Sequence, residues 1–344
     1  MKLGFLPLLY VTVMLQAADY SATRATVDSI EVVRLQDAAR KLEVLIAPSV
    51  GNLAFEMRAN GKNILWKPDA SLPDIRDRRL LCGNPLLAPW ANRIAGDAFH
   101  ANGRKFLLNP EIGNLRRDPN NNPIHGLLAF SPLWEVVELK AGDSAAWVIS
   151  RLEYWRYPEL MAQFPFAHTL EMTYRVENGA LQVITRLKNY ARERMPVAIG
   201  YHPYFTLDDA ARDEWRVHVA ARDQFLLSPQ LVPTGERRPV ALPDPALLRE
   251  NKLDDVFGNL VRGEDGIAEF WVQGRRQKIA VRYGPRYPVA VVFAPPGRNF
   301  ICFEPMTAVT NAFNLAHEGR YPDLQSIPPD GEWFESFWIV PSGF

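Results

Sequence analysis

Apolar and polar residues alternate with a period of two along most of the chain after its first twenty positions. In the segment His168–Asn189 the alternation runs over Leu170–Val176, stops at Asn178-Gly179, and resumes over Leu181–Leu187. Because Asn-Gly readily adopts the positive φ angles of a two-residue turn, this segment predicts a β-hairpin.

Other segments have the same strand pattern, and turn residues separate most of them. They are Lys41–Ile46, Trp134–Leu139, Trp215–Ala220, Ala268–Val272, Lys278–Tyr283, Val289–Ala294, Phe300–Glu304 and Trp333–Val340. Helical periodicity is confined to Pro245–Glu250 and Thr310–Ala316. The pattern predicts an all-β, mostly antiparallel sandwich with few short helices. Residues 19–344 are expected to form one domain, since Asp118–Pro123 and Arg237–Pro245 have the composition of loops rather than linkers.

The first 18 residues have the pattern of a secretory signal peptide. Lys2 precedes the apolar run Leu3–Leu15, which is too short for a membrane span, and cleavage is expected after Ala17 or Ala18. The alternative is a buried N-terminal strand. The first interpretation predicts an exported protein, periplasmic or secreted, that does not contact a membrane once the leader is removed.

Composition narrows the function classes. The chain has 39 basic and 39 acidic side chains, so it lacks the positive charge of a nucleic-acid-binding protein. Its 28 prolines argue against long helices. Cys82 and Cys302 either pair in an oxidising compartment or remain buried thiols, and their spacing matches no metal-site template.

Three motifs place hydrogen-bonding groups beside apolar or glycine residues. Asn92-Arg93 follows a proline turn, and Arg93 either donates to a polar ligand or bonds a loop carbonyl. His125 precedes Gly126, which allows close approach to the backbone, although a plain loop histidine is the alternative. Asp254 either accepts hydrogen bonds from ligand hydroxyls or lies in a solvated turn beside Asp255.

A histidine and a glutamate are the candidates for proton transfer. His202 lies in Gly200-Tyr-His-Pro-Tyr-Phe205, among aromatic rings that either desolvate an active imidazole or simply bury it. Glu304 ends the apolar strand Phe300–Glu304, where desolvation is expected to raise its pKa; a rim glutamate in a salt bridge is the alternative. A glutamate with a raised pKa and a protonated histidine suit general base and general acid catalysis.

Taken in order, these motifs resemble the aldose 1-epimerase (galactose mutarotase) family from about Leu42 to Pro341. The matching segments are Asn84–Ile94, Gly96-x-x-Phe99, Gly103, His125-Gly126, Phe164-Pro-Phe166, Gly200–Phe205, Asp254-x-x-Phe257, Phe303-Glu304-Pro305 and Asn311. The resemblance implies a β-supersandwich and an isomerase that interconverts the α and β anomers of a free aldose. Pro-Trp-Ala before Asn92 departs from the glycine-rich version common in the family, which leaves the sugar open.

The resemblance also implies roles for the site residues. His202 protonates the ring oxygen, and Glu304 takes the proton from the C1 hydroxyl. The residues expected to bind substrate are Asn92, Arg93, His125, Tyr204 and Asp254, and the candidate apolar walls are Trp90, Tyr201, Tyr204 and Phe303. No metal or other cofactor is expected, because no electron or phosphoryl group is transferred. The expected partner is a monosaccharide, bound by a monomer or homodimer.

Other functions remain open at this stage. One is a non-catalytic carbohydrate-binding protein on the same fold, and another is a glycoside-processing enzyme, which usually requires two carboxylates. A third is an enzyme acting on sugar phosphates, which requires a basic cluster near the pocket. Arg116-Arg117 and Arg275-Arg276 are basic pairs, but the sequence does not place either pair there.

Overall fold

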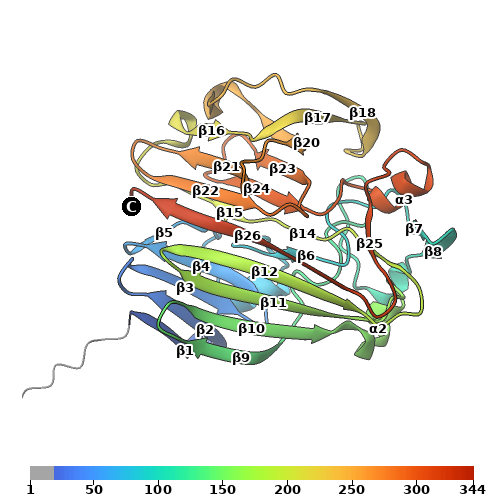
Figure 1. The fold of residues 1–344 in the computed structure, drawn as a ribbon, viewed down its shortest axis with the longest axis horizontal. Helices are drawn as coiled ribbons and strands as arrows, with labels where there is room; N and C mark the ends of the chain where they lie inside the picture. Colours follow the sequence, from blue (N-terminus) through green and yellow to red (C-terminus); the bar gives the residue numbers. More distant parts are fainter. Residues whose placement is uncertain (1–18) are drawn as a thin grey trace, which may run out of the picture.

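A computed structural model describes residues 19–344, which form antiparallel β-sheets connected by loops and a few short helices (Figure 1). This confirms the predicted all-β class. The predicted signal peptide, residues 1–18, lies outside the described residues. No helix within residues 19–344 has the length and apolar character needed to cross a membrane.

The largest sheet has nine strands and runs through most of the molecule in Figure 1. In spatial order its strands are β19 (Ala246–Leu247), β16 (Arg216–His218), β21 (Ala268–Gln273), β22 (Lys278–Tyr283), β26 (Glu332–Ser342), β12 (Ala180–Asn189), β11 (His168–Glu177), β10 (Ala146–Glu153) and β9 (Glu135–Ala141). The hairpin β11–β12 has the predicted bounds, and its turn residues Asn178 and Gly179 both have positive φ.

A second sheet of eight strands carries the candidate site. Its strands are β18 (Pro233–Pro239), β17 (Ala221–Leu227), β20 (Leu253–Leu260), β23 (Val289–Ala294), β24 (Ile301–Met306), β14 (Gly200–Tyr201) and β6 (Leu86–Leu87), with β15 (Tyr204–Phe205) also paired to β24. In a pleated sheet, residues directly opposite each other on neighbouring strands point to the same face. Register therefore decides which side chains of this sheet meet.

A five-stranded sheet, two small ribbons and short helices complete the described chain. The sheet consists of β1 (Tyr20–Val27), β2 (Ile30–Asp37), β3 (Leu42–Ala47), β4 (Leu53–Ala59) and β5 (Lys62–Asn63). The ribbons are β7 (Ala98–Ala101) with β8 (Arg104–Leu107), and β13 (Met195–Val197) with β25 (Gln325–Ile327). The α-helices are α1 (Leu72–Asp77), α2 (Pro158–Met161) and α3 (Ala312–His317), and 3₁₀ turns cover Pro110–Ile112, Tyr154–Arg156, Arg212–Glu214 and Leu248–Glu250.

Two local predictions need correction. The predicted helical piece Pro245–Glu250 is a short strand, β19, followed by a single 3₁₀ turn. The predicted loop Arg237–Pro245 begins inside β18, whose polar, exposed residues pair with β17. Both segments lie at the edges of sheets, where few side chains are buried and the apolar alternation is weak.

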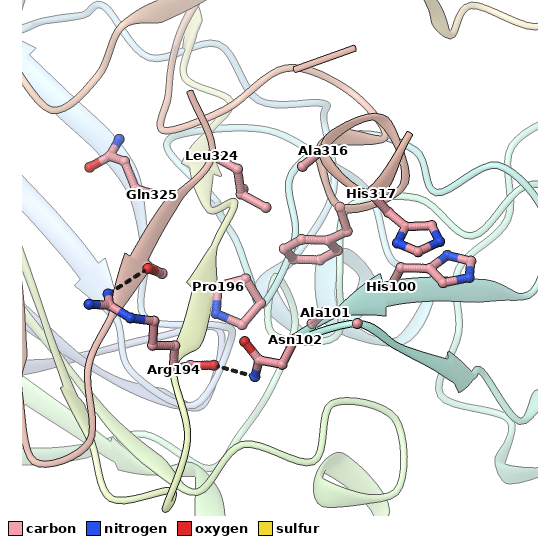
Figure 2. Close-up of a pocket in the computed structure, with 12 residues that line it drawn as sticks. His100, Ala101, Asn102, Arg194, Pro196, Ala316, His317, Leu324 and Gln325 are labelled. Atoms are coloured by element: carbon pink, nitrogen blue, oxygen red, sulfur yellow. Dashed lines mark hydrogen bonds between the residues drawn. The ribbon is translucent and has the colours of Figure 1, made fainter. Parts of the chain in front are cut away.

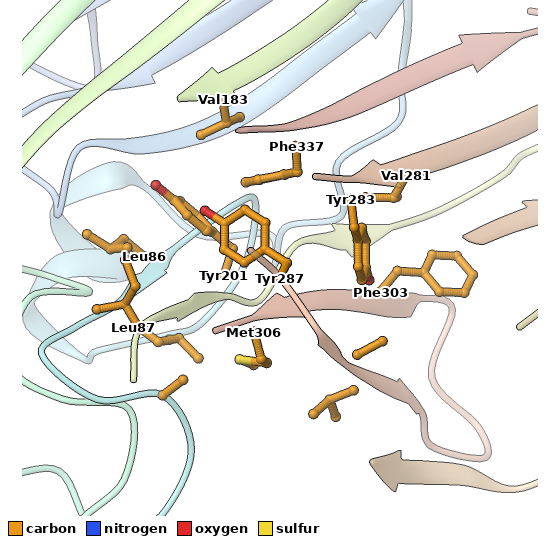
Figure 3. Close-up of a cluster of buried hydrophobic side chains, with 14 of the residues drawn as sticks. Leu86, Leu87, Val183, Tyr201, Val281, Tyr283, Tyr287, Phe303, Met306 and Phe337 are labelled. Atoms are coloured by element: carbon orange, nitrogen blue, oxygen red, sulfur yellow. The ribbon is translucent and has the colours of Figure 1, made fainter. Parts of the chain in front are cut away.

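The main core is shared by the nine-stranded, eight-stranded and five-stranded sheets. Figure 3 shows Tyr201, Phe303 and Phe337 in this core, together with Tyr283 and Tyr287. Within this core the Tyr201 hydroxyl forms a hydrogen bond with the Thr185 hydroxyl. Tyr201 and Phe303 are therefore core residues and do not form the predicted walls of the site. Burying one such large apolar side chain contributes about 1.5–3 kcal/mol.

The two cysteines are buried, free thiols in different clusters. Cys82 packs with Leu53 and Phe55, whereas Cys302 packs with Tyr204 and Phe300. Burial raises the pKa of the Cys82 thiol to about 12 and raises that of Cys302 strongly. Of the two possibilities left open by the sequence, the structure shows free thiols.

Candidate active site

Glu304 in β24 meets His202, which lies in the connection between the neighbouring strands β14 and β15. Gly200 in β14 pairs with Met306, and Tyr204 in β15 pairs with Cys302, so the connecting His202 lies opposite Glu304. The His202 Nε2 atom is 3.3 Å from the Glu304 Oε1 atom. Both residues are buried, with 6% and 1% of their surface exposed. The structure thus brings together the two residues predicted to transfer protons.

Burial favours the uncharged form of both groups. Desolvation raises the pKa of Glu304 well above its usual value, and the Asp254 charge adds to this rise while Arg93 opposes it. Desolvation, helped by the positive charge of Arg116, lowers the pKa of His202 to about 3. The raised pKa of Glu304 agrees with the sequence analysis. The imidazole differs from that analysis, which expected it to be protonated, because its surroundings exclude water.

Arg93 is fixed in the site by a carboxylate that the sequence analysis did not single out. Its Nε donates to the Asp118 Oδ2 atom at 2.6 Å, and Asp118 is almost fully buried. Burial alone would raise the pKa of Asp118, but hydrogen bonds from the Asn122 amide and Arg93 outweigh it, and the net pKa is lowered. Asp118 is therefore an ionised partner that orients the Arg93 guanidinium. The Arg93 Nη atoms form no hydrogen bond with any of the described residues.

The loops beside the sheet hold their residues in unusual backbone conformations. Asn92, His125 and Asn311 all have positive φ angles, which cost free energy for residues other than glycine. The His125 amide donates to the Asn92 carbonyl at 2.9 Å, and the Asn311 amide donates to the Arg93 carbonyl at 2.8 Å. These bonds tie the His125 and Arg93 loops together. Desolvation is the main reason that the pKa of His125 is well below its usual value.

Register distinguishes the two adjacent aspartates, which the sequence could not. Asp254 lies opposite Phe293, which lies opposite Cys302, so Asp254 is on the same face as Glu304. Asp254 is exposed, and partial desolvation of its carboxyl raises its pKa. Asp255 points to the other face and accepts a hydrogen bond from Gln224. Asp254 is thus the aspartate that lies toward the site.

Aromatic rings form one wall around His202. Tyr204 stacks on the imidazole with ring centroids 4.6 Å apart, and Phe293 meets it edge-on at 6.0 Å. Phe300 and Trp66 extend this wall behind Tyr204. Of the predicted wall residues, Tyr204 lies beside His202, whereas Trp90 is buried in the main core.

Three buried polar atoms in the site have no hydrogen-bond partner among residues 19–344. They are Glu304 Oε2, His202 Nδ1 and His125 Nδ1. A buried polar atom without a partner costs free energy, so such a group is usually satisfied by water or a ligand. The arrangement can thus bind a polar molecule and exchange protons with it. No three His, Cys, Asp or Glu side chains of the described residues are grouped as metal ligands.

The sequence analysis named Arg116 as part of a basic pair but could not place it. The structure places Arg116 near His125 and Tyr204, where its charge influences the pKa of His202. The other basic pair, Arg275-Arg276, lines a different surface hollow with Phe344 and Asp209.

A cavity that Glu304 does not line lies between α3 and the two ribbons. Its volume is about 260 Å³. Figure 2 shows the side-by-side rings of His100 and His317 at its edge, and their centroids are 4.1 Å apart. None of the predicted site residues lines this cavity.

Comparison with known proteins places the chain in a family. The family model described as aldose 1-epimerase matches residues 46–339, and the chain therefore belongs to the aldose 1-epimerase family. It is 22% identical to the uncharacterized protein YihR of Escherichia coli K12 over 236 residues, which cover 67% of this chain and 71% of YihR.

Solved structures have the same fold. A galactose mutarotase-like protein from Clostridium acetobutylicum superposes with a TM-score of 0.84 at 20% identity, covering 95% of this chain and 99% of that one. A galactose 1-epimerase from Lactobacillus acidophilus superposes with a TM-score of 0.72 at 14% identity, covering 95% and 100%. The galactose mutarotase-like fold expected from the sequence is confirmed.

Proposed function

We propose that this protein is an aldose 1-epimerase that interconverts the α and β anomers of a free aldose. The observation that carries the proposal is the buried pair of His202 and Glu304, 3.3 Å apart, with Arg93 and Asp254 beside it. Family membership supports the reaction class.

The reaction needs one group that accepts a proton and one that donates a proton. A proton leaves the C1 hydroxyl while another reaches the ring oxygen, and the bond between C1 and the ring oxygen breaks to give the open aldehyde. Rotation about the bond between C1 and C2, followed by ring closure on the other face, gives the second anomer. The protons then return, so the enzyme ends as it began.

The opposite pKa shifts of the pair suit this exchange. When Glu304 and His202 are both neutral, the pair has one proton to transfer, and that proton is on the Glu304 carboxyl. When that proton is on His202, Glu304 is ionised and accepts the C1 hydroxyl proton while the imidazolium donates to the ring oxygen. Arg93 favours the ionised glutamate, since its charge lowers the pKa of Glu304. In this proposal Arg93, His125 and Asp254 bind sugar hydroxyls, while Asn92 and Tyr204 shape the site around them.

The test is the rate of anomer exchange, followed by polarimetry and by exchange NMR, on α-D-glucose, α-D-galactose and a panel of neutral and anionic aldoses. The wild-type protein should accelerate exchange of at least one sugar. Glu304→Gln and His202→Asn should each lower the rate by about 10²–10⁴-fold, which is the usual contribution of a general acid or base.

Asp255→Asn is the matched control, because Asp255 neighbours Asp254 in sequence but points to the opposite face. It should retain the wild-type rate. A wild-type protein that binds aldoses without accelerating exchange would instead be a carbohydrate-binding protein. Full activity in Glu304→Gln would overturn the assignment of the base.

A further inference from the structure

Arg116 is a partly buried cation next to the proposed active site. Its carbonyl accepts a hydrogen bond from the Ile124 amide at 2.9 Å, which places it against the segment that leads into His125. Its Nη1 atom is buried and has no hydrogen-bond partner among the described residues. Desolvation lowers the pKa of Arg116, and its charge lowers the pKa values of both His125 and His202.

Arg116 and His125 together line a cavity of about 400 Å³. The other charged residues of its lining are Arg76, Asp77, Arg79 and Glu159. Arg76 is already paired with Asp77 at 2.7 Å.

Two cations of this lining remain without a carboxylate. Neither Arg79 nor Arg116 forms an ion pair with any residue in the part of the chain that the structure describes, and Glu159 is the one remaining carboxylate of the lining. Arg79 and Arg116 line the same cavity, and the charge of Arg79 adds to the larger effect of desolvation in lowering the pKa of Arg116. Like charges placed together at a cavity are unfavourable unless an anion joins them.

The side chain of the neighbouring Arg117 has hydrogen-bond partners within the protein. Its Nη1 donates to Asp97 at 2.8 Å and to the Asn121 carbonyl at 2.7 Å. The Arg116 side chain forms no equivalent bond with any of the described residues, and its Nη1 atom is buried. Guanidinium groups match carboxylate and phosphate oxygens in charge and geometry, and a neutral sugar offers no such partner.

We infer that the substrate is an aldose bearing an anionic substituent, and that Arg116 and Arg79 bind this anion in the cavity beside His125. The inference rests on the proposed aldose 1-epimerase activity and narrows its substrate class. The basic pair Arg116-Arg117, which the sequence could not place, thus contributes one of its two members to the pocket. A carboxylate and a phosphate both fit this chemistry.

The experiment compares matched neutral and anionic sugars. Anomer exchange is measured by NMR for D-galactose with D-galacturonate, and for D-glucose with D-glucuronate and D-glucose 6-phosphate. The wild-type kcat/KM should be at least about tenfold higher for an anionic sugar than for its neutral partner, consistent with charge-assisted hydrogen bonds. Added salt should weaken that advantage, because it screens charges. The uronates and the phosphate distinguish the source of the anion.

Variants separate anion binding from structural support. Arg116→Gln should lower kcat/KM for the preferred anionic sugar by about 10–100-fold more than it lowers kcat/KM for the matched neutral sugar, since a lost charged hydrogen bond has that effect. Arg79→Gln should act in the same direction, and Arg116→Lys should restore part of the loss. Arg78→Gln is the control, because exposed Arg78 does not line the cavity.

The outcomes distinguish this inference from the proposed function. Equal kcat/KM for neutral and anionic sugars, with loss of both in Glu304→Gln, overturns the inference and leaves the epimerase activity standing. A loss of activity that Arg116→Gln imposes equally on both sugars also overturns it. If no sugar is exchanged, calorimetric binding of D-galacturonate that is weakened in Arg116→Gln supports the anion site while the proposed function fails. Absence of that binding overturns both.

Discussion

At the scale of the residue, Asp118 connects the loop to the site. One carboxylate oxygen accepts the Arg93 Nε proton, and the other accepts the amides of Asn120 and Asn122. A single side chain therefore sets both the turn of the loop and the direction of the guanidinium. We regard Asp118 as a positioning residue, since it acts through Arg93.

Two substitutions separate these tasks. Asp118→Asn keeps an oxygen for the Asn120 and Asn122 amides but removes the charge that faces Arg93. We expect kcat/KM to fall by about 10–100-fold, because a charged hydrogen bond at the site is lost, with a small change in stability. Steady-state anomer-exchange kinetics and chemical denaturation measure the two effects.

Asp118→Ala removes both sets of bonds. It should cost about 2–4 kcal/mol of unfolding free energy, because buried donors lose their partners. Equal stability of the Asn and Ala variants would show that the turn does not depend on this carboxylate.

Individual residues of the site differed in how well the sequence revealed them. His202 and Glu304 lie in motifs with apolar neighbours, so burial and an unusual pKa followed from local sequence. Asp118 and Arg116 carry no such local sign, because their importance arises from loop contacts with Arg93 and His125. The choice between Asp254 and Asp255 required the register of β20 against β23, which residue types alone do not fix.

At the scale of the element, the loop that holds His125 depends on a glycine. Gly126 has a φ of +62°, and a Cβ at this position would lie 2.1 Å from the Ala88 carbonyl oxygen. Gly126→Ala should therefore destabilise the protein by about 2–4 kcal/mol and displace His125, because the alanine would have both an unfavourable φ and a clash with the backbone. Chemical denaturation and anomer-exchange rates are the measurements.

Gly96→Ala is the matched comparison for this prediction. Gly96 has a φ of +74°, but a Cβ there would meet nothing within 4 Å. It should cost only about 1 kcal/mol and leave the exchange rate nearly unchanged. Similar losses in both variants would show that the approach of Ala88 is not the controlling contact.

Elements were predictable where one face is buried and the other is exposed. The hairpin β11–β12 was predicted to the residue, because strict alternation and Asn178-Gly179 agree on the same structure. The pair β17–β18 was missed, since its second strand is almost entirely exposed and polar. Tertiary pairing, rather than local sequence, makes that segment a strand.

At the scale of the whole molecule, the buried glutamate makes stability depend on pH. The folded-state pKa of Glu304 is raised, so its contribution is fully favourable below its ordinary pKa of 4.5 and is lost as pH rises through the folded-state value. Glu304→Gln removes the free-energy cost of burying an ionised carboxylate at high pH. It should raise the unfolding free energy at pH 8 by about 1–3 kcal/mol, at roughly 1.4 kcal/mol per pKa unit, and should have little effect near pH 4.

Denaturant titrations between pH 4 and pH 8 test this expectation. Glu332→Gln is the control, because Glu332 is exposed and paired with Arg186, and its removal should change stability little at either pH. A Glu304→Gln variant that is less stable than the wild-type protein at pH 8 would mean that the carboxylate is ionised and stabilised in the fold. A stable variant without activity would exclude misfolding as the cause of the loss.

The placement of His202 and Glu304 by paired strands has an evolutionary consequence. Their separation is set by backbone bonds of β14, β15 and β24, whereas Arg79, Arg116 and His125 come from loops outside those strands. In the proposed epimerase, mutations in these loops would change which sugar binds without moving His202 and Glu304. Such a division would allow related proteins to change their substrate while they keep the positions of His202 and Glu304.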